Sequence, residues 1–279
     1  MDSRYQEIEV LITVKTSPEP SKQYYDTVCV AGIRIDNGHY DWVRLYPIRF
    51  RHLDEDDQFR KYEVLRLQVR PPHGDSRKES CSPEQTKIIR VRSLPAWIDR
   101  AKIMDQVPRT TTCQLHAAAL ADINAPSLGM VDVAELGTLQ FEKHPGWTPE
   151  QQKKLEAAYF LPDTDLFGQK PHTPPRLKAP KLKVKCPYRC TSPDCPGHVA
   201  QLLDWELTAL QARFTTDEEA KKAIISKFHD IPGGPDRMLS FYVGNFFDVR
   251  KRAIFSILGM YYPPRSDVLK VRAASNTLF

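Results

Sequence analysis

Four side chains that bind soft metal ions lie close together in the second half of the chain. Residues 186–198 read Cys-Pro-Tyr-Arg-Cys-Thr-Ser-Pro-Asp-Cys-Pro-Gly-His, which brings Cys186, Cys190, Cys195 and His198 within thirteen residues. Thiolates and a neutral imidazole are the ligands of a tetrahedral Zn²⁺ site, and the prolines and glycine between them favour tight turns. The sequence therefore predicts a loop stabilised by a structural zinc ion.

The spacing of these residues ranks the ligands. Three residues lie between Cys186 and Cys190, whereas ordinary zinc fingers place two residues between paired cysteines. Cys190, Cys195 and His198 are therefore the firmer ligands, and the fourth is either Cys186 or a distant residue brought in by the fold. The alternative is that the four residues cluster by chance. The three remaining cysteines, Cys29, Cys81 and Cys113, are expected to be small buried hydrophobic residues.

Two carboxylates, Asp204 and Glu206, follow closely after His198. They could bind a catalytic Mg²⁺, Mn²⁺ or Zn²⁺ that activates water against a phosphodiester, which would make the protein a nuclease. They could instead orient a metal-bound imidazole, or be ordinary charges at a helix start. On an ideal helix, side chains two residues apart point in different directions, which argues against both holding one ion.

Familiar catalytic signatures are absent from the sequence. It contains no Gly-rich phosphate loop, because Pro232-Gly-Gly-Pro lacks the Lys-Ser/Thr that should follow. It also contains no Gly-x-Ser-x-Gly elbow, no His-Glu-x-x-His pair and no zinc-deaminase signature. The conventional hydrolase, kinase and deaminase classes are therefore disfavoured.

Basic and aromatic residues indicate a polyanionic partner. On a predicted strand, Trp42, Arg44 and Tyr46 share one face, where arginines can contact phosphate and rings can stack on unpaired bases. The alternative is a hairpin that buries its aromatic residues and leaves its arginines in water. Residues 168–193 contain seven Lys or Arg and no acid, which predicts a basic arm leading to the metal loop. The candidate nucleic-acid-binding residues are Trp42, Arg44, Tyr46, Arg49, Arg51, Lys181, Lys183, Lys185 and Arg189.

The composition predicts a soluble globular protein. The 279 residues carry a formal net charge of +5 and are 41% hydrophobic, which permits a polyanionic partner without requiring one. No apolar run approaches the roughly 18 residues that span a membrane, and the N-terminus lacks the features of a signal peptide. We expect a cytoplasmic protein with no membrane partner.

The alternation of polar and apolar residues predicts an α+β fold. Short strands, including a hairpin that turns at Asn37-Gly38, predict a curved N-terminal antiparallel sheet or small barrel, similar in size to PUA or OB folds. A helical middle follows, and a zinc-stabilised C-terminal α+β part ends in a β-hairpin. A helix is expected over 199–214, and no internal repeat is visible. The expected domains are 1–94 (β-rich), 95–160 (helical or mixed), 161–185 (Pro-rich basic linker) and 186–279 (zinc-bearing).

These observations favour a zinc-containing protein that binds DNA or RNA through the basic arm and the aromatic strand. Two alternatives stay open. One is the metal-dependent nuclease built on Asp204 and Glu206. The other is a structural protein in which zinc only stabilises a small subdomain and the partner is another protein.

Overall fold

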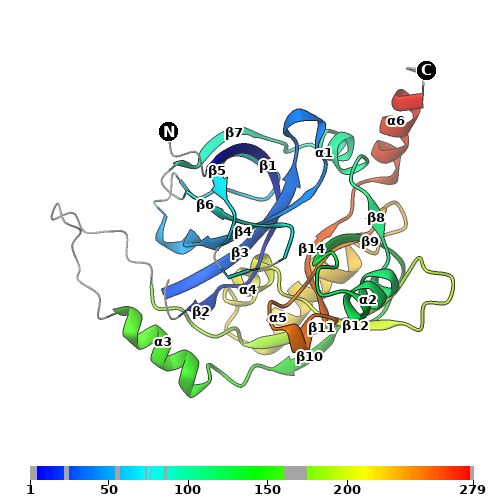
Figure 1. Ribbon diagram of the computed structural model, residues 1–279. Helices are drawn as coiled ribbons and strands as arrows, with labels where there is room; N and C mark the ends of the chain where they lie inside the picture. Colours follow the sequence, from blue (N-terminus) through cyan, green and yellow to red (C-terminus); the bar gives the residue numbers. More distant parts are fainter. Residues whose placement is uncertain are drawn as a thin grey trace.

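The protein has a mixed α+β fold that begins with a closed five-stranded barrel, which confirms the predicted fold class (Figure 1). The computed structural model describes residues 5–21, 25–53, 57–72, 74–75, 77–84, 87–159 and 175–276. The first part of the predicted linker, 161–174, lies outside the described residues. Within the described ranges, no helix is both long and apolar enough to cross a membrane.

Barrel 1 contains five strands from the first third of the chain. Their order is β1-β3-β4-β6-β5, and the barrel closes because β5 pairs with β1. All neighbours are antiparallel except β4 and β6. The strands are β1 (Gln6–Lys15), β3 (Tyr25–Arg34), β4 (Trp42–Ile48), β5 (Glu63–Arg70) and β6 (Ser80–Pro83); β2 (Glu19–Ser21) extends β3, and β7 (Ile89–Ser93) extends β5.

The sequence pattern explains the barrel. In β1, Ile8, Val10 and Ile12 alternate with residues that face outward, and they join one buried apolar core. The hairpin between β3 and β4 turns at Asn37 and Gly38, whose φ angles are 54° and 76°. Asn and Gly tolerate this left-handed region better than other residues, so the predicted turn forms.

The middle of the chain links barrel 1 to a second barrel. Helix α1 (Trp97–Met104), the short strand β8 (Arg109–Thr110) and helix α2 (Thr112–Ala121) follow one another. At its N-terminus α2 has a complete capping box between Thr111 and Gln114, which satisfies backbone N–H groups that the helix itself leaves unpaired. This cap fixes where α2 starts.

Barrel 2 repeats the strand order of barrel 1. Its five strands are connected β9-β11-β12-β14-β13, and β13 pairs with β9. The parallel link between β12 and β14 is a bridge from Leu202 to Ile257, where Leu203 N–H donates to the Ile257 carbonyl at 2.8 Å. The strands are β9 (Leu128–Leu136), β11 (Leu182–Cys190), β12 (His198–Gln201), β13 (Ser240–Asn245) and β14 (Phe255–Tyr261).

When strands are numbered within each barrel, both have the order 1-2-3-5-4, with the third and fifth strands parallel. This is the Greek-key arrangement of an OB-type barrel. The sequence shows no repeat because a barrel of this kind requires only alternating apolar residues, which many different sequences provide.

Further helices cover barrel 2 and its junction with barrel 1. α3 packs on β2 and β3 of barrel 1, and α6 packs on α1 (Figure 1). The remaining elements are β10 (Gln140–Lys143), α3 (Pro149–Tyr159), α4 (Trp205–Gln211), α5 (Asp217–Ile225), its π-helical continuation Ser226–Asp230, and α6 (Arg265–Asn276).

The two barrels share an apolar interface. Leu11 and Ile33 of barrel 1 pack in one buried cluster with Met130, Tyr242 and Leu258 of barrel 2. Each of these side chains is at most 4% exposed. Outward-facing residues of both barrels are therefore removed from water, which holds the barrels in one arrangement.

The structure corrects one predicted element and adds others. The helix expected over 199–214 is wrong at its start, because β12 occupies His198–Gln201 and α4 begins only at Trp205. The apolar spacing of Val199, Leu202 and Leu203 fits either a helix or a strand that runs into an irregular segment. Strand β6 and helix α6 were not expected, since β6 is short and lies among polar residues.

Candidate metal centre and inter-barrel cavity

Cys113, Cys190, Cys195 and His198 form a cluster that could hold a metal ion. Their ligand atoms all lie within 4.8 Å of one another. Cys190 Sγ is 3.5 Å from Cys195 Sγ and 3.7 Å from Cys113 Sγ, while His198 Nε2 is 3.4 Å from Cys113 Sγ and 3.6 Å from Cys190 Sγ.

These separations match the edges of a tetrahedral coordination shell. Zn–S bonds of about 2.3 Å and Zn–N bonds of about 2.0 Å place neighbouring ligand atoms about 3.5–3.8 Å apart in a regular tetrahedron. Three thiols and one imidazole are also a ligand set found in structural zinc sites. The residues therefore fit Zn²⁺, although the cluster alone does not identify the metal.

Three elements position the ligands. Cys190 ends β11, Cys195 lies in the following turn, and His198 begins β12, so one hairpin supplies three ligands. Gly197 has a φ of 90°, which a residue with a side chain rarely adopts, and it directs the chain back into β12. Cys113 comes from the first turn of α2. The neighbouring Thr112 Oγ1 lies 2.8 Å from Tyr188 Oη of β11, which fastens α2 to the same hairpin.

The environment separates the pKa values of two of the thiols. Burial raises the pKa of Cys113 to about 11, and the neighbouring thiols Cys190 and Cys195 add to this. For Cys190, burial acts in the same direction, but backbone hydrogen bonds from Cys113 and Ser192, together with hydrogen bonds from His198 and Cys195, outweigh it and lower the pKa to about 6. Of these two thiols, Cys190 is therefore the better prepared to act as a thiolate ligand.

Cys113 replaces Cys186 in the predicted ligand set. Cys186 is completely buried in the core of barrel 2, outside the cluster, and burial raises the pKa of its thiol to about 12. In β11, the side chains of Cys186 and Cys190 both face inward. The two residues are four positions apart, and in an extended strand this spacing separates them by more than 10 Å. The expectation that Cys113 is only a small hydrophobic residue is wrong, and nothing in the sequence distinguishes it from Cys29 or Cys81.

Asp204 and Glu206 are engaged by lysines instead of joining the metal cluster. Asp204 is 1% exposed and caps α4 by accepting a hydrogen bond from Glu206 N–H at 2.9 Å. Lys61 Nζ lies 2.8 Å from Asp204 Oδ2 and 2.7 Å from Glu206 Oε1, and Lys227 Nζ lies 2.6 Å from Glu206 Oε2. Among the described residues, neither carboxylate belongs to a group of three or more metal-binding side chains.

Lys15 lies in the same neighbourhood and is unusually buried for a lysine. Its ammonium donates to the Phe59 carbonyl at 2.9 Å and sits 4.1 Å from the centre of the Phe50 ring. Burial lowers the pKa of Lys15 to about 8; Lys61 lowers it further, while Glu206 and Asp204 oppose the shift. A cavity of about 340 Å³ adjoins these charged groups.

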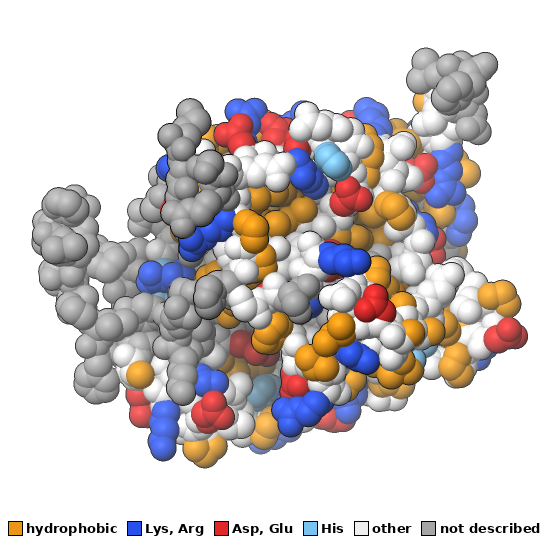
Figure 2. Space-filling model, in the orientation of Figure 1, with side chains coloured by type: hydrophobic (Ala, Val, Ile, Leu, Met, Phe, Trp, Pro, Cys, Tyr) orange, Lys and Arg blue, Asp and Glu red, His pale blue; other side chains and the backbone are white. Residues whose placement is uncertain are grey.

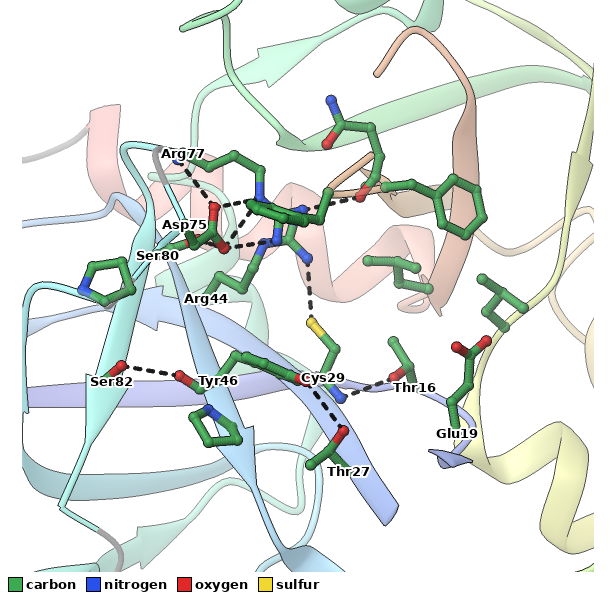
Figure 3. A pocket seen from close by; sticks show the side chains of 18 of the residues that line it. Thr16, Glu19, Thr27, Cys29, Arg44, Tyr46, Asp75, Arg77, Ser80 and Ser82 are labelled. Atoms are coloured by element: carbon green, nitrogen blue, oxygen red, sulfur yellow. Dashed lines mark hydrogen bonds and ion pairs between the residues drawn. The ribbon is translucent and has the colours of Figure 1, made fainter. Parts of the chain in front are cut away.

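A larger cavity, of about 930 Å³, lies between the two barrels (Figure 3). We call it the inter-barrel cavity. Outward-facing residues of three adjacent strands of barrel 1 form one wall, and the end of β13 with the following loop forms another. The first wall contains Thr27, Cys29, Arg44, Tyr46, Ser80 and Ser82; the second contains Gly244, Asn245, Phe246 and Phe247; Arg70, Arg77 and Lys154 also line the cavity, where Arg77 pairs with Asp75 and Lys154 with Glu150.

Arg44 forms no ion pair with any residue that the structure describes. Arg44 is 3% exposed and donates to the Ser127 carbonyl at 3.2 Å, to Ser127 Oγ at 3.1 Å and to Cys29 Sγ at 3.2 Å. All these acceptors are neutral, and the nearest carboxylate in the hydrogen-bond chain, Glu79, is reached only through Ser127. Buried cations normally have an anionic partner, so this arrangement favours an anion in the cavity.

A second arginine in the cavity is neutralised and held in place. Arg77 forms a two-pronged ion pair with Asp75, with Nε–Oδ1 and Nη2–Oδ2 distances of 2.9 and 2.8 Å (Figure 3). It also donates to the Asn245 carbonyl at 3.3 Å and lies 5.6 Å from the centre of the Phe247 ring. Arg77 therefore links the two walls.

The structure brings only part of the predicted nucleic-acid-binding set together. Arg44 and Tyr46 line the inter-barrel cavity, but Trp42 packs edge-on against Tyr242 at the barrel interface. Arg51 pairs with Asp26 at 2.5 Å, and Arg49 lies just after β4, outside the cavity lining. The sequence could not show that Arg70, Arg77, Lys154, Phe246 and Phe247 would join Arg44, since they come from four other segments.

The predicted basic arm ends in a strand of barrel 2. Lys183, Lys185 and Arg189 point outward from β11, and Lys185 pairs with Glu142 at 2.6 Å. Lys181 donates to backbone carbonyls of Phe214 and Thr215. Figure 2 shows basic and acidic side chains interspersed over one face of the molecule, so the net positive charge forms no single basic field there.

Replacing cysteines inside and outside the cluster tests the metal centre. We expect purified protein to contain about one zinc per chain, and Cys113→Ser to lose it as fully as Cys195→Ser does. Cys186→Ser should keep the metal, because its thiol lies outside the cluster. Metal analysis of the three variants decides between the two ligand sets: loss of zinc in Cys186→Ser with retention in Cys113→Ser would contradict this site.

The lysine–carboxylate cluster predicts unequal effects on stability. Lys61→Met should lower the free energy of unfolding by about 3 kcal/mol, because it leaves the buried Asp204 carboxylate without its cation. Lys227→Met removes a partly exposed ion pair and should cost less than about 1 kcal/mol. Urea unfolding of both variants measures this difference, and equal costs would contradict the cluster geometry.

Lys15 predicts a pH dependence of stability. The folded state loses the Lys15 proton near pH 8 and the unfolded state near 10.5, so the unfolded chain binds more protons between these values. The stability of the wild type relative to Lys15→Met should therefore rise, by up to about 3 kcal/mol, between pH 8 and 10.5 and stay constant below pH 8. Urea unfolding across this range measures it; a flat difference would show that Lys15 has an ordinary pKa.

Comparison with known proteins places the chain in a family without assigning an activity. One family model, described as domain of unknown function DUF8758, matches residues 6–106. No curated protein matches the sequence. A chain of a replication protein A heterotrimer bound to single-stranded DNA is similar with a TM-score of 0.35 and 9% identity, over 99% of this chain and 53% of that chain. This chain thus spans about half the length of that one, and a similarity this weak carries no argument. A second family model matches residues 108–279, more than half of the sequence, so the chain belongs to the family described as domain of unknown function DUF8757.

Proposed function

We propose that the protein binds single-stranded nucleic acid in the inter-barrel cavity. The observation that carries this proposal is the buried guanidinium of Arg44, which lines the cavity and forms no ion pair among the described residues. A phosphate group would supply the missing negative charge, and arginine binds phosphate with well-directed hydrogen bonds.

The composition of the cavity supports a nucleotide over a simple anion. Tyr46 and Phe247 are 38% and 59% exposed, so their rings are accessible for stacking against unpaired bases. Arg70 is exposed and forms no ion pair among the residues that the structure describes. Phosphate-binding cations next to accessible aromatic rings are the combination used by proteins that bind single strands.

The position of the cavity on barrel 1 agrees with the proposal by analogy of fold. Its wall is formed by β3 and β4, the second and third strands of an OB-type barrel, and by the loop between β5 and β6. OB folds often bind oligonucleotides on this face. A fold does not determine a function, so this analogy adds to the argument from Arg44 without replacing it.

We assign the metal cluster a structural role in this function. The cluster joins α2 to the hairpin of β11 and β12, and Ser127, which receives the Arg44 hydrogen bonds, lies between α2 and β9. The metal would therefore stabilise the part of barrel 2 that faces the cavity. The nuclease alternative is not favoured, because Lys61 and Lys227 neutralise Asp204 and Glu206.

Charge reversal at the entrance of the cavity tests the proposal. Arg70→Glu and Lys154→Glu should each weaken binding of an internally labelled single-stranded oligonucleotide at least about tenfold, because each replaces an attraction to phosphate with a repulsion. In a plot of the logarithm of the association constant against the logarithm of the salt concentration, each variant should also have a slope that is less steep by about 0.7 per lost phosphate contact. Fluorescence anisotropy over a salt series measures both quantities.

A charge change outside the cavity provides the control. Lys102 on α1 is exposed and, among the described residues, pairs with Asp99 alone, so Lys102→Glu should change affinity no more than twofold. The proposal fails if wild-type protein does not bind single-stranded DNA or RNA, or if Lys102→Glu weakens binding as much as Arg70→Glu does.

A further inference from the structure

The inner end of the inter-barrel cavity is lined by buried residues, and hydrogen bonds near it connect the two barrels. Arg77 donates to the Asn245 carbonyl at 3.3 Å, and Arg44 donates to the Ser127 carbonyl at 3.2 Å. Ser127 N–H in turn donates to Glu79 at 2.6 Å. These hydrogen bonds join barrel 1 to barrel 2 beside the cavity and hold the buried Arg44 side chain in place.

Exposure changes from the inner end of the cavity to its entrance. Arg44, Ser80 and Ser256 are between 2% and 5% exposed, whereas Tyr46 and Phe247 are 38% and 59% exposed. The unneutralised cation thus lies deep and the accessible aromatic rings lie at the entrance. A ligand that fits this order carries its negative charge at its tip and a flat apolar group behind it.

Arg44 keeps hydrogen-bonding capacity for such a charged tip. Among the described residues, its Nη1 donates only to Cys29 Sγ, which is a weak acceptor, so Nη1 keeps an N–H for a ligand. An N–H of a guanidinium forms a strong, charge-assisted hydrogen bond with a phosphate oxygen. An internal phosphodiester offers two such oxygens but is flanked by chain on both sides, whereas a terminal phosphate has three and is flanked on one side.

We infer that the cavity binds the phosphorylated end of a nucleic-acid strand, with the terminal phosphate against Arg44 and the last base against the rings at the entrance. This inference rests on the proposed function and adds that the ligand is a strand terminus. The cavity volume of about 930 Å³ is within the range of sites that enclose small organic ligands, which leaves room for a terminal nucleotide.

The test compares oligonucleotides of one sequence that differ only at their ends. The set consists of an internally labelled single strand of about eight nucleotides with a 5′-phosphate, with a 3′-phosphate, with two hydroxyl ends, and as a closed circle. We expect one phosphorylated form to bind at least tenfold more tightly than the hydroxyl form, and the circle to bind no better than the hydroxyl form. The 5′ and 3′ forms show which end enters.

Two variants assign this preference to the cavity. Ser82 lines the cavity from β6, so Ser82→Phe should narrow it and remove the preference for the phosphorylated end (Figure 3). Arg44→Lys keeps a positive charge but loses the guanidinium N–H donors, and it should reduce the preference at least fivefold. Ser93→Phe adds the same bulk on the exposed strand β7 and should leave the preference intact. Thermal unfolding verifies that each variant is folded.

The outcomes separate this inference from the proposed function. Equal affinity for the circle and for every linear form would overturn end binding while leaving single-strand binding intact. A preference for phosphorylated ends that survives in folded Ser82→Phe would also overturn it, because the end would then bind elsewhere. Absence of binding to all four oligonucleotides would overturn the proposed function itself.

Discussion

The packing of the two barrels against each other is the constraint on which the rest of the structure depends. Leu11 and Ile33 from barrel 1 meet Met130 and Tyr242 from barrel 2 in a dry apolar interface. Burial of this area fixes the distance and angle between the barrels. It also covers the outward side chain of Arg44, which an isolated barrel would leave in water. The cavity and its buried cation both follow from this contact.

The metal cluster and the Asp204 cluster stabilise this arrangement in different ways. Cys113 and His198 belong to segments that are distant in the sequence, and a metal between them would hold α2 against barrel 2. Lys61 lies in the turn just before β5 of barrel 1, whereas Asp204 caps α4 beside barrel 2, so their ion pair crosses the junction directly. Forming a buried ion pair adds little net stability, whereas separating the two charges leaves each of them buried without a partner and is strongly destabilising. The pair therefore favours the one relative position of the barrels in which both charges are paired.

Sequence reasoning recovered what is encoded locally. The alternating residues of β1, the turn at Asn37 and Gly38 and the cluster of Cys190, Cys195 and His198 all depend on neighbours in the chain. Cys113 could not be found because it is joined to that cluster only by the fold, and the inter-barrel cavity gathers Arg44 with residues more than a hundred positions away. The carboxylate of Asp204 looked catalytic because its partner, Lys61, is equally distant in sequence. Charge and spacing identify candidate groups, but only tertiary contacts show which of them are already neutralised.

The central claim is that a single strand of nucleic acid lies in the cavity between the barrels. Photocrosslinking tests it most directly: an oligonucleotide containing 4-thiothymidine is irradiated in complex with the protein, and the crosslinked peptides are identified by mass spectrometry. We predict crosslinks at the cavity entrance, in the peptides that contain Tyr46 and Phe247. Crosslinks confined to the outward face of β11, around Lys183 and Arg189, would contradict the account.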